Sequence, residues 1–479
     1  MNKSMIRYIL GYILAMQSAL MLLPVVVAML YREQEGIYYL GVALTGAVIG
    51  GLIVRKKPDE SIFYLKEGCI ATALGWIIMS LYGCLPFVLT GEIPCFTDAL
   101  FETVSGFTTT GASILSDVEA LSHCSLFWRS FTHWIGGMGV LVFLLTILPL
   151  SGGSHINLMR AESPGPSVGK LVPKVKHTAR ILYIIYLGMT VIEILLLLLG
   201  DMPLFDALTT AFGTAGTGGF GIKNTSMMDY SPYLQWVVTI FMVLFGINFN
   251  AYYLMLFGKF KRAFAMEEVR WYLIIIAFAT GVIFLQILGS SAGVFDALTH
   301  SSFQVASIIT TTGFSTIDFD LWPQTSRTIL VLLMFIGACA GSTGGGIKVS
   351  RLLLMGKTVG KELKQALHPQ VVAPVRMDGK VVNHETIRAT NVYVAAYIFI
   401  FAASFFLISL DGFDMVTNFT AIAATLNNIG PGLAQVGPMM NFGSYSNPAK
   451  LVMIFDMLAG RLEIFPMLVF FMPDTWRRF

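Results

Sequence analysis

The chain has 479 residues, of which 55% are hydrophobic, 13% aromatic and only 12% charged, with a formal net charge of +3 and a mean hydropathy of +0.72. This composition excludes a soluble globular protein and gives no indication of nucleic-acid binding. The chain is therefore predicted to be an integral membrane protein in contact with membrane lipid.

Ten apolar segments approach the length of about 20 residues that a membrane-spanning helix needs. They lie at 8–30, 37–54, 68–90, 131–150, 181–199, 233–257, 271–289, 328–356, 390–410 and 449–472. The first segment follows Lys3 and Arg7 and lacks a cleavage pattern, so we expect a retained anchor and not a signal peptide. The five cysteines are odd in number and scattered, which indicates neither a disulfide framework nor a metal site.

The basic residues predict the orientation, because Lys and Arg concentrate in short cytoplasmic loops. Most of the 31 basic residues fall on one side of the ten spans, together with the N-terminus, which we place inside. The opposite side collects acids, at Glu92, Asp98, Glu102, Asp117, Glu119, Asp201, Asp206, Asp229, Asp296, Asp318, Asp320, Asp411 and Asp414. Their field would concentrate cations at the outer face; the alternative is that they belong to ordinary solvated loops.

A unit of similar sequence occurs four times along the chain. "FETVSGFTTTGAS" at 101–113 and "FQVASIITTTGFS" at 303–315 share one frame, and weaker copies are "FGTAGTGGFG" at 212–221 and "ATLNNIGPG" at 424–432. The aligned glycines are Gly111, Gly219, Gly313 and Gly430. An Asp ahead of each copy, at Asp98, Asp206, Asp296 and Asp414, is expected to be the N-cap of a half-helix that ends near the glycine.

The predicted fold is an all-α integral membrane protein. It consists of four repeats of span, half-helix, loop and span around a pseudo-fourfold pore, plus two extra N-terminal helices. The expected boundaries are 1–60 for the N-terminal pair, then 61–155, 156–262, 263–365 and 366–479 for the four repeats.

Physical chemistry gives these repeats a function. Irregular backbone at membrane depth persists only when it is buried or lines a water-filled cavity. The carbonyl end of a half-helix carries partial negative charge, and the glycine that follows can turn successive carbonyls toward a common axis. Four such loops would replace the hydration shell of a cation, with the threonine hydroxyls bracing the backbone. The pattern therefore predicts a cation-selectivity filter.

These features resemble the Trk/Ktr/HKT superfamily of K⁺ transporters, most closely its TrkH-type membrane subunits. The resemblance covers nearly the whole chain and rests on the four loops. It rests also on "FWRSFTHWIGGMGVLVF" at 127–143, "GACAGSTGGGIKVSR" at 337–351 and "MLAGRLEIFP" at 457–466. It implies K⁺ as the transported ion and metal contacts at the filter alone.

The resemblance also implies which residues form the filter. They are Thr109, Thr110, Gly111, Thr217, Gly218, Gly219, Thr311, Thr312, Gly313, Asn428, Ile429 and Gly430. Glycine at all four aligned positions is the pattern associated with K⁺ preference, and the fourth loop departs most from the threonine pattern.

The span at 328–356 contains "GSTGGG", which cannot continue a stable helix because each interior glycine costs about 1 kcal/mol relative to alanine. A break in the span is therefore predicted. One interpretation is a kink packed against a neighbouring helix. The other, which the resemblance favours, is an intramembrane gate made by Gly341, Ser342, Thr343, Gly344, Gly345 and Gly346, with Lys348 at the inner mouth.

Arg461 lies within the last predicted span, where a charge costs about 2.5–3.5 kcal/mol. One interpretation is a structural ion pair with an acid on another span, such as Glu193. The other, which the resemblance favours, is a positive charge below the filter that opposes cation flow and couples to the gate.

Enzyme chemistry is not indicated, because the seven histidines form no zinc motif and "GSTGGGIK" lacks the context of a nucleotide-binding loop. The closer alternative is a secondary transporter coupled to Na⁺ or H⁺, although such transporters usually contain twofold inverted repeats. The resemblance implies a homodimer in the bacterial cytoplasmic membrane and a cytoplasmic ring of TrkA-type NAD- or ATP-binding subunits, so that this chain itself binds no cofactor. The basic clusters on the inner side could serve as the docking surface for that ring, but simple orientation signals are the other interpretation.

Overall fold

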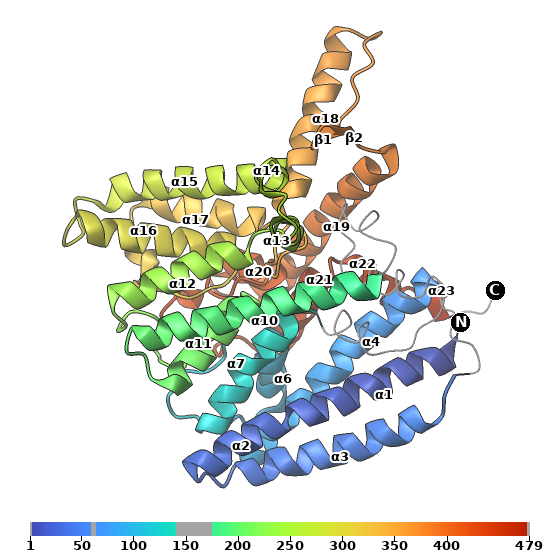
Figure 1. Cartoon of the computed structure of the whole chain (residues 1–479), viewed down its shortest axis with the longest axis vertical. Helices are drawn as coiled ribbons and strands as arrows, with labels where there is room; N and C mark the ends of the chain where they lie inside the picture. The colour runs from blue at the N-terminus through green and yellow to red at the C-terminus, as the bar shows by residue number, and fades with distance from the viewer. Residues whose placement is uncertain (1, 59–63, 140–174, 477–479) are drawn as a thin grey trace.

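The computed structural model describes residues 2–58, 64–139 and 175–476. The chain begins with helices α1 (Lys3–Leu20), α2 (Leu22–Tyr31) and α3 (Gly36–Arg55). Helix α1 packs against both α3 and α4 (Leu65–Gly83). Figure 1 shows these N-terminal helices side by side at one flank of the bundle. The contact with α3 is close, because Gly50 has backbone of Ala15 and Gly11 where a Cβ would lie.

The next helices follow the order long helix, short helix, loop, helix. In the first group, α4 is followed by α5 (Leu85–Thr90), the short α6 (Phe96–Phe107) and α7 (His123–Gly137). The second group contains α10 (Val175–Leu199), the short α11 (Leu204–Gly216), α12 (Pro232–Phe245), α13 (Phe249–Leu256) and α14 (Phe260–Phe264).

The same order continues to the C-terminus. The third group contains α15 (Glu267–Ile287), the short α16 (Val294–Ile309), the 3-10 turn η1 (Phe319–Leu321), α17 (Gln324–Ile336) and α18 (Val349–Leu367). The antiparallel strands β1 (Arg376–Met377) and β2 (Lys380–Val381) follow. The last group contains α19 (His384–Ile408), η2 (Ser409–Asp411), the short α20 (Met415–Leu426), η3 (Ala434–Val436), α21 (Asn447–Arg461), α22 (Phe465–Phe471) and α23 (Pro473–Trp476). Figure 1 shows α18 projecting from the bundle with the two strands beside it.

Six helical segments in the described residues are long and apolar enough to cross a membrane, or seven if one bent pair is counted. They are Lys3–Tyr31, Gly36–Arg55, Leu65–Thr90, Ala179–Leu199, Glu267–Ile287 and His384–Asp411, and the bent pair is α12 with α13. Large apolar side chains remain exposed on them, including Phe278 and Phe399. This surface fits a hydrocarbon solvent. The predicted span at 131–150 lies partly outside the described residues.

Two predicted continuous spans are wrong in detail. The segment at 233–257 is bent by 90° between α12 and α13. The segment at 449–472 is interrupted between α21 and α22, where Glu463 and Ile464 both have positive φ. A run of glycines marked the break between α17 and α18 in the sequence, whereas the signals at these two breaks are single residues: Gly246 and Asn248 after α12, and Pro466 at the start of α22.

The expected N-caps are correct at only one of four positions. Asp414 caps α20, accepting from the amides of Val416 and Thr417 at 3.0 and 3.1 Å. The other three short helices begin earlier than the Asp, and their N-cap residues are Cys95, Pro203 and Gly293. Asp98, Asp206 and Asp296 lie in the first helical turn instead. There the positive end of the helix dipole still stabilises their carboxylates.

Candidate functional site

Four loops follow the short helices α6, α11, α16 and α20. We call them loop 1 (108–111), loop 2 (216–219), loop 3 (310–313) and loop 4 (427–430). Each contains two residues with positive φ, the aligned glycine and the residue two positions before it. The earlier residues are Thr109, Thr217, Thr311 and Asn428, with φ of 54°, 56°, 60° and 56°; the glycines have φ of 78°, 74°, 90° and 100°. The four loops therefore share one backbone conformation, including loop 4.

The hydrogen bonds of the loops are equally alike. The residue before each aligned glycine donates its backbone amide to the carbonyl five residues earlier in the short helix. The bonds are Thr110 to Ser105 at 2.9 Å, Gly218 to Gly213 at 2.8 Å, Thr312 to Ser307 at 2.8 Å and Ile429 to Ala424 at 2.9 Å. This bond and the left-handed residue form the Schellman arrangement that commonly ends a helix. Threonine or asparagine takes the position that glycine usually holds, a substitution that sequence reasoning did not anticipate.

The four glycines connect the loops into a closed ring. A Cβ on Gly111 would collide with the carbonyl oxygen of Gly218, one on Gly219 with that of Thr312, and one on Gly313 with that of Ile429. The ring closes because a Cβ on Gly430 would lie 2.8 Å from the carbonyl oxygen of Thr110. Each glycine is required twice, by its φ and by the carbonyl of the next loop. Four backbone carbonyls, one from each loop, are thereby brought together at the ends of four helix dipoles.

Threonine hydroxyls brace loops 1 and 3 in the expected way. Thr108 donates to the carbonyl of Val104 at 2.6 Å, and its hydroxyl lies 2.8 Å from that of Thr110. Loop 3 repeats this with Thr310, which donates to Ala306 at 2.6 Å and lies 2.7 Å from Thr312. In loop 4 the side-chain amide of Asn427 stands in place of the hydroxyls of Thr108 and Thr310.

The side chain of Asn428 in loop 4 joins three elements. Its Nδ2 donates to the hydroxyl of Thr110 in loop 1 and to the carbonyl of Met457 in α21, both at 2.9 Å. The least threonine-like loop is therefore held against loop 1 by a hydrogen bond between side chains. This bond makes the fourth loop a full member of the ring.

A buried ion pair supports loop 1 from behind. The guanidinium of Arg129 lies 2.5 Å from a carboxylate oxygen of Glu102, and the two side chains are 3% and 0% exposed. Glu102 also accepts from the hydroxyl of Ser113 and the amide of Ile114. Arg129 continues to the carbonyl of Gly221 at 2.7 Å, just beyond loop 2. The sequence placed Glu102 among the acids of the outer face without a partner, because hydropathy does not reveal that two charges meet across 27 positions.

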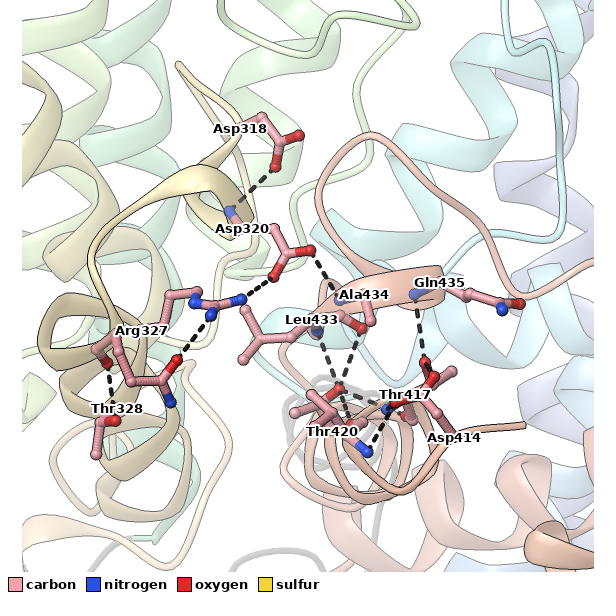
Figure 2. Close-up of polar contacts among 12 residues, drawn as sticks. Asp318, Asp320, Arg327, Thr328, Asp414, Thr417, Thr420, Leu433, Ala434 and Gln435 are labelled. Atoms are coloured by element: carbon pink, nitrogen blue, oxygen red, sulfur yellow. Dashed lines mark hydrogen bonds and ion pairs between the residues drawn. The ribbon is translucent and has the colours of Figure 1, made fainter. Parts of the chain in front are cut away.

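Other carboxylates that the sequence places at the outer face also form ion pairs or hydrogen bonds within the protein. Asp320 accepts from Arg327 and from the amide of Ala434, both at 3.2 Å (Figure 2). Asp98 forms an ion pair of 2.6 Å with Lys450. These pairs and that of Glu102 offset part of the negative field expected from the acids at the outer face. Figure 2 also shows Asp414 and Thr417 at the start of α20, where the carboxylate caps the helix.

The predicted break in the third group extends from 337 to 348, between α17 and α18. Its glycine-rich part lies directly against loops 3 and 4. The amide of Gly345 donates to the hydroxyl of Thr311 at 2.6 Å, and that of Gly346 to the carbonyl of Asn427 at 3.1 Å. A Cβ on Gly344 would lie 2.9 Å from the carbonyl of Thr310. The segment is thus packed against two of the four loops.

The other end of this segment is held by the corner between α12 and α13. The amide of Cys339 donates to the carbonyl of Gly246, and the amide of Phe249 to that of Gly341, at 3.1 and 3.0 Å. Glu268 of α15, buried and not singled out from the sequence, accepts from the amides of Ala340 and Ser350 at 2.6 and 3.2 Å. One carboxylate therefore fastens both sides of the break.

Lys348 and Arg461 both contact the backbone of this segment. Lys348 is buried, and its ammonium donates to the carbonyl of Gly344. Arg461 is the last residue of α21. Its guanidinium donates to the carbonyls of Thr343 and Gly137, each at 2.8 Å. It thus connects the break to the C-terminal end of α7.

The suggested partner of Arg461 is wrong. Glu193 is buried in α10, and both its carboxylate oxygens lack a hydrogen-bond partner among the described residues. Glu463, two positions after Arg461, instead pairs with Arg351 of α18. Arg461 instead donates to the backbone carbonyls of Thr343 and Gly137.

Comparison with known proteins gives one consistent result. The family model TrkH, described as cation transport protein, matches residues 38–477. The chain is 35% identical over 482 residues to the Trk system potassium uptake protein TrkH of Salmonella typhimurium, covering 98% of this chain and 99% of that protein. It is 33% identical over 491 residues to the Trk system potassium uptake protein TrkG of Escherichia coli, with full coverage of both. The crystal structure of the potassium transporter TrkH from Vibrio parahaemolyticus superposes with a TM-score of 0.89 at 33% identity over all of both chains.

Proposed function

The chain belongs to the TrkH family of cation transport proteins, and from this premise we propose that it takes up K⁺ across the bacterial cytoplasmic membrane through a channel-like pore. The observation that carries the proposal is the closed ring of loops 1 to 4. Four carbonyls, from Thr110, Gly218, Thr312 and Ile429, meet where four helix dipoles end, an arrangement that stabilises a dehydrated cation.

The proposed pore has a filter and a gate. The filter comprises the twelve loop residues predicted from the sequence, with backbone carbonyls as ligands and hydroxyls as braces. The gate is the segment 341–346 with Lys348, whose contacts with loops 3 and 4 support a position beneath the filter. Arg461 is proposed to oppose cation flow at this level, because it bridges the gate and α7.

Several features of the assembly are part of the same proposal. The four repeats have the boundaries expected from the sequence, with the two-helix addition at 1–60. The N-terminus lies inside, two copies form a dimer, and a cytoplasmic TrkA-type nucleotide-binding ring regulates the pore. The protein is proposed to be no enzyme and to bind no cofactor itself. Support for the orientation comes from the basic residues of α18 and of the loops on its side.

One observation favours the second candidate, a cation transporter coupled to Na⁺ or H⁺. The carboxyl group of Glu193 is buried at membrane depth, and its oxygens lack partners among the described residues. Such a group suits a proton relay. Proton movement that accompanies K⁺ uptake in proteoliposomes, and is lost in Glu193→Gln, would favour this candidate over the channel-like pore.

Growth at limiting K⁺ tests the main proposal. A host that lacks K⁺ uptake would receive the wild-type chain with its regulatory subunit, or the variant Gly313→Ser. We expect rescue by the wild type and none by the variant, because a side chain at 313 would displace the carbonyl of Ile429. No rescue by the wild type would contradict K⁺ uptake, and equal rescue by a well-expressed variant would contradict the filter.

A further inference from the structure

His133 is a buried residue of α7 that lies between loops 1 and 2. Its side chain is fully buried, and both ring nitrogens have backbone partners. Nδ1 lies 2.7 Å from the carbonyl oxygen of Gly106, and Nε2 lies 3.2 Å from the amide of Phe220. Because an amide N–H only donates, Nε2 must accept, and Nδ1 must carry the proton that it gives to Gly106. The two bonds fix a neutral imidazole in one tautomer.

The two partners of this imidazole flank two neighbouring loops on opposite sides. Gly106 lies in the last turn of α6, and its carbonyl also receives the amide of Thr109, the left-handed residue of loop 1. Phe220 directly follows Gly219, the aligned glycine of loop 2. The side chain of His133 therefore ties the start of loop 1 to the end of loop 2.

The imidazole of His133 also explains why residue 218 in loop 2 is a glycine. A Cβ on Gly218 would overlap Nδ1, Cγ and Cε1 of the imidazole, although Gly218 is not among the residues with positive φ. Glycine is needed there because the histidine fills the space. The carbonyl of Gly218 is one of the four in the ring and abuts Gly111 of loop 1. The imidazole thus packs against the Cα of the residue whose carbonyl abuts loop 1.

Further contacts hold the imidazole in place. The ring of Phe220 lies 4.3 Å from that of His133, and the guanidinium of Arg129 lies 3.6 Å from the centre of the Phe220 ring. Arg129 is itself fixed by the buried Glu102. A continuous set of contacts therefore runs from the buried ion pair through Phe220 to His133 and loop 2.

We propose that His133 is a positioning residue for cation selection, which sets the separation between the ring carbonyls of loops 1 and 2. This inference rests on the proposed filter function. Discrimination between K⁺ and Na⁺ depends on how firmly the coordinating carbonyls are held, and on their spacing. Loss of the two hydrogen bonds would let the carbonyl of Gly218 move, so that the smaller cation becomes better tolerated.

Two substitutions at His133 distinguish a role of its hydrogen bonds from a role in filling space. Glutamine can both donate and accept, so His133→Gln should keep the two bonds, whereas His133→Leu fills space and makes neither. In proteoliposomes with the regulatory subunit, we expect His133→Leu to lower the K⁺-to-Na⁺ flux ratio by at least about 5-fold, because one buried hydrogen bond is worth about that factor and two are lost. His133→Gln should stay close to wild type, and the exposed His384→Gln serves as the control for an unrelated histidine.

A second experiment tests the steric relation with Gly218 and remains decisive if His133→Leu does not fold. Gly218→Ala should reduce K⁺ flux strongly in the wild-type background but much less in His133→Ala, because the space that the imidazole occupied is then free. Equal effects in both backgrounds would overturn the inference, as would an unchanged flux ratio in a folded His133→Leu. Failure of the wild type to transport K⁺ would instead overturn the proposed function.

Discussion

The amide of Gly345 donates a hydrogen bond of 2.6 Å to the hydroxyl of Thr311. One partner belongs to the proposed gate and the other is the left-handed residue of loop 3. The proposed filter and the proposed gate are therefore in direct contact, and a movement of the segment 341–346 away from loop 3 would break this bond. The positions of the two segments are linked in this conformation.

Removal of that bond is predicted to loosen the gate. Thr311→Val preserves the shape of the side chain but cannot accept from Gly345, so basal K⁺ flux should rise in proteoliposomes. Thr109→Val is the matched comparison, because Thr109 has the same backbone conformation in loop 1 and its hydroxyl lacks a partner among the described residues. We expect a clearly smaller change there. Equal changes in the two variants would show that the hydroxyl of Thr311 has no special role.

The ring is predicted to reject a side chain at Gly111 for a reason beyond backbone strain. Gly111 and Gly91 share a φ of 78°, but a Cβ at Gly91 would meet nothing within 4 Å. Alanine should cost about 1–2 kcal/mol of left-handed strain at either site. Only at Gly111 should it also displace the carbonyl of Gly218 and abolish selective K⁺ transport. Flux and thermal unfolding of the two purified variants measure the difference, and equal loss of transport would refute the steric argument.

The charge of Arg461 is predicted to restrain flux. Arg461→Ala removes both the positive charge and the bonds to Thr343 and Gly137, so K⁺ flux should increase. Arg461→Lys keeps the charge but cannot reproduce the fork of donors. If charge is the barrier, the Lys variant should resemble wild type; if the bridge to the gate matters more, it should resemble the Ala variant. Unchanged flux in a folded Ala variant would leave only a structural role.

The junction between the turn that joins α2 to α3 and the start of α7 is predicted to weaken in acid. Burial tends to raise the pKa of Glu33, but hydrogen bonds from the amides of Cys124 and His123 and from the His123 ring outweigh it, so the pKa lies below the ordinary value of 4.5. A carboxylate with a lowered folded pKa contributes stability above its unfolded pKa and loses it as the pH falls through the folded pKa.

Thermal unfolding of the detergent-solubilised protein, followed from neutral pH to below the ordinary carboxyl pKa, measures this effect. Glu33→Gln should lower the unfolding temperature at neutral pH and flatten its dependence on pH in the acid range. A variant with the same acid sensitivity as wild type would show that other carboxylates dominate.

Much of the site was predictable, because the pattern of loops 1 and 3 is nearly identical and the chemistry of glycine is specific. The break before Lys348 followed from its glycines, and the comparison with TrkH proteins agrees with the family resemblance. What the pattern could not provide was the second left-handed position. Thr109, Thr217, Thr311 and Asn428 adopt it in the turn that ends each short helix, at a position where glycine is the usual residue.

The remaining differences share a physical cause. Helix starts depend on small balances among caps, so Asp98 lies inside α6 although it would serve as an N-cap. The pairing of Arg129 with Glu102, and the place of His133 between two loops, depend on contacts across 27 and 87 positions. Periodicity and composition report local preference, whereas these contacts exist only after the four helical groups have assembled.

Because the contacts of the ring run from each loop to the next, loop 4 is the piece that meets both loop 3 and loop 1. Asn428 and Thr110, which close the circle, are separated by 318 positions. During synthesis, the ring therefore cannot close until the last quarter of the chain, which contains loop 4, has been made. A chain truncated before loop 4 would therefore lack one side of the proposed filter.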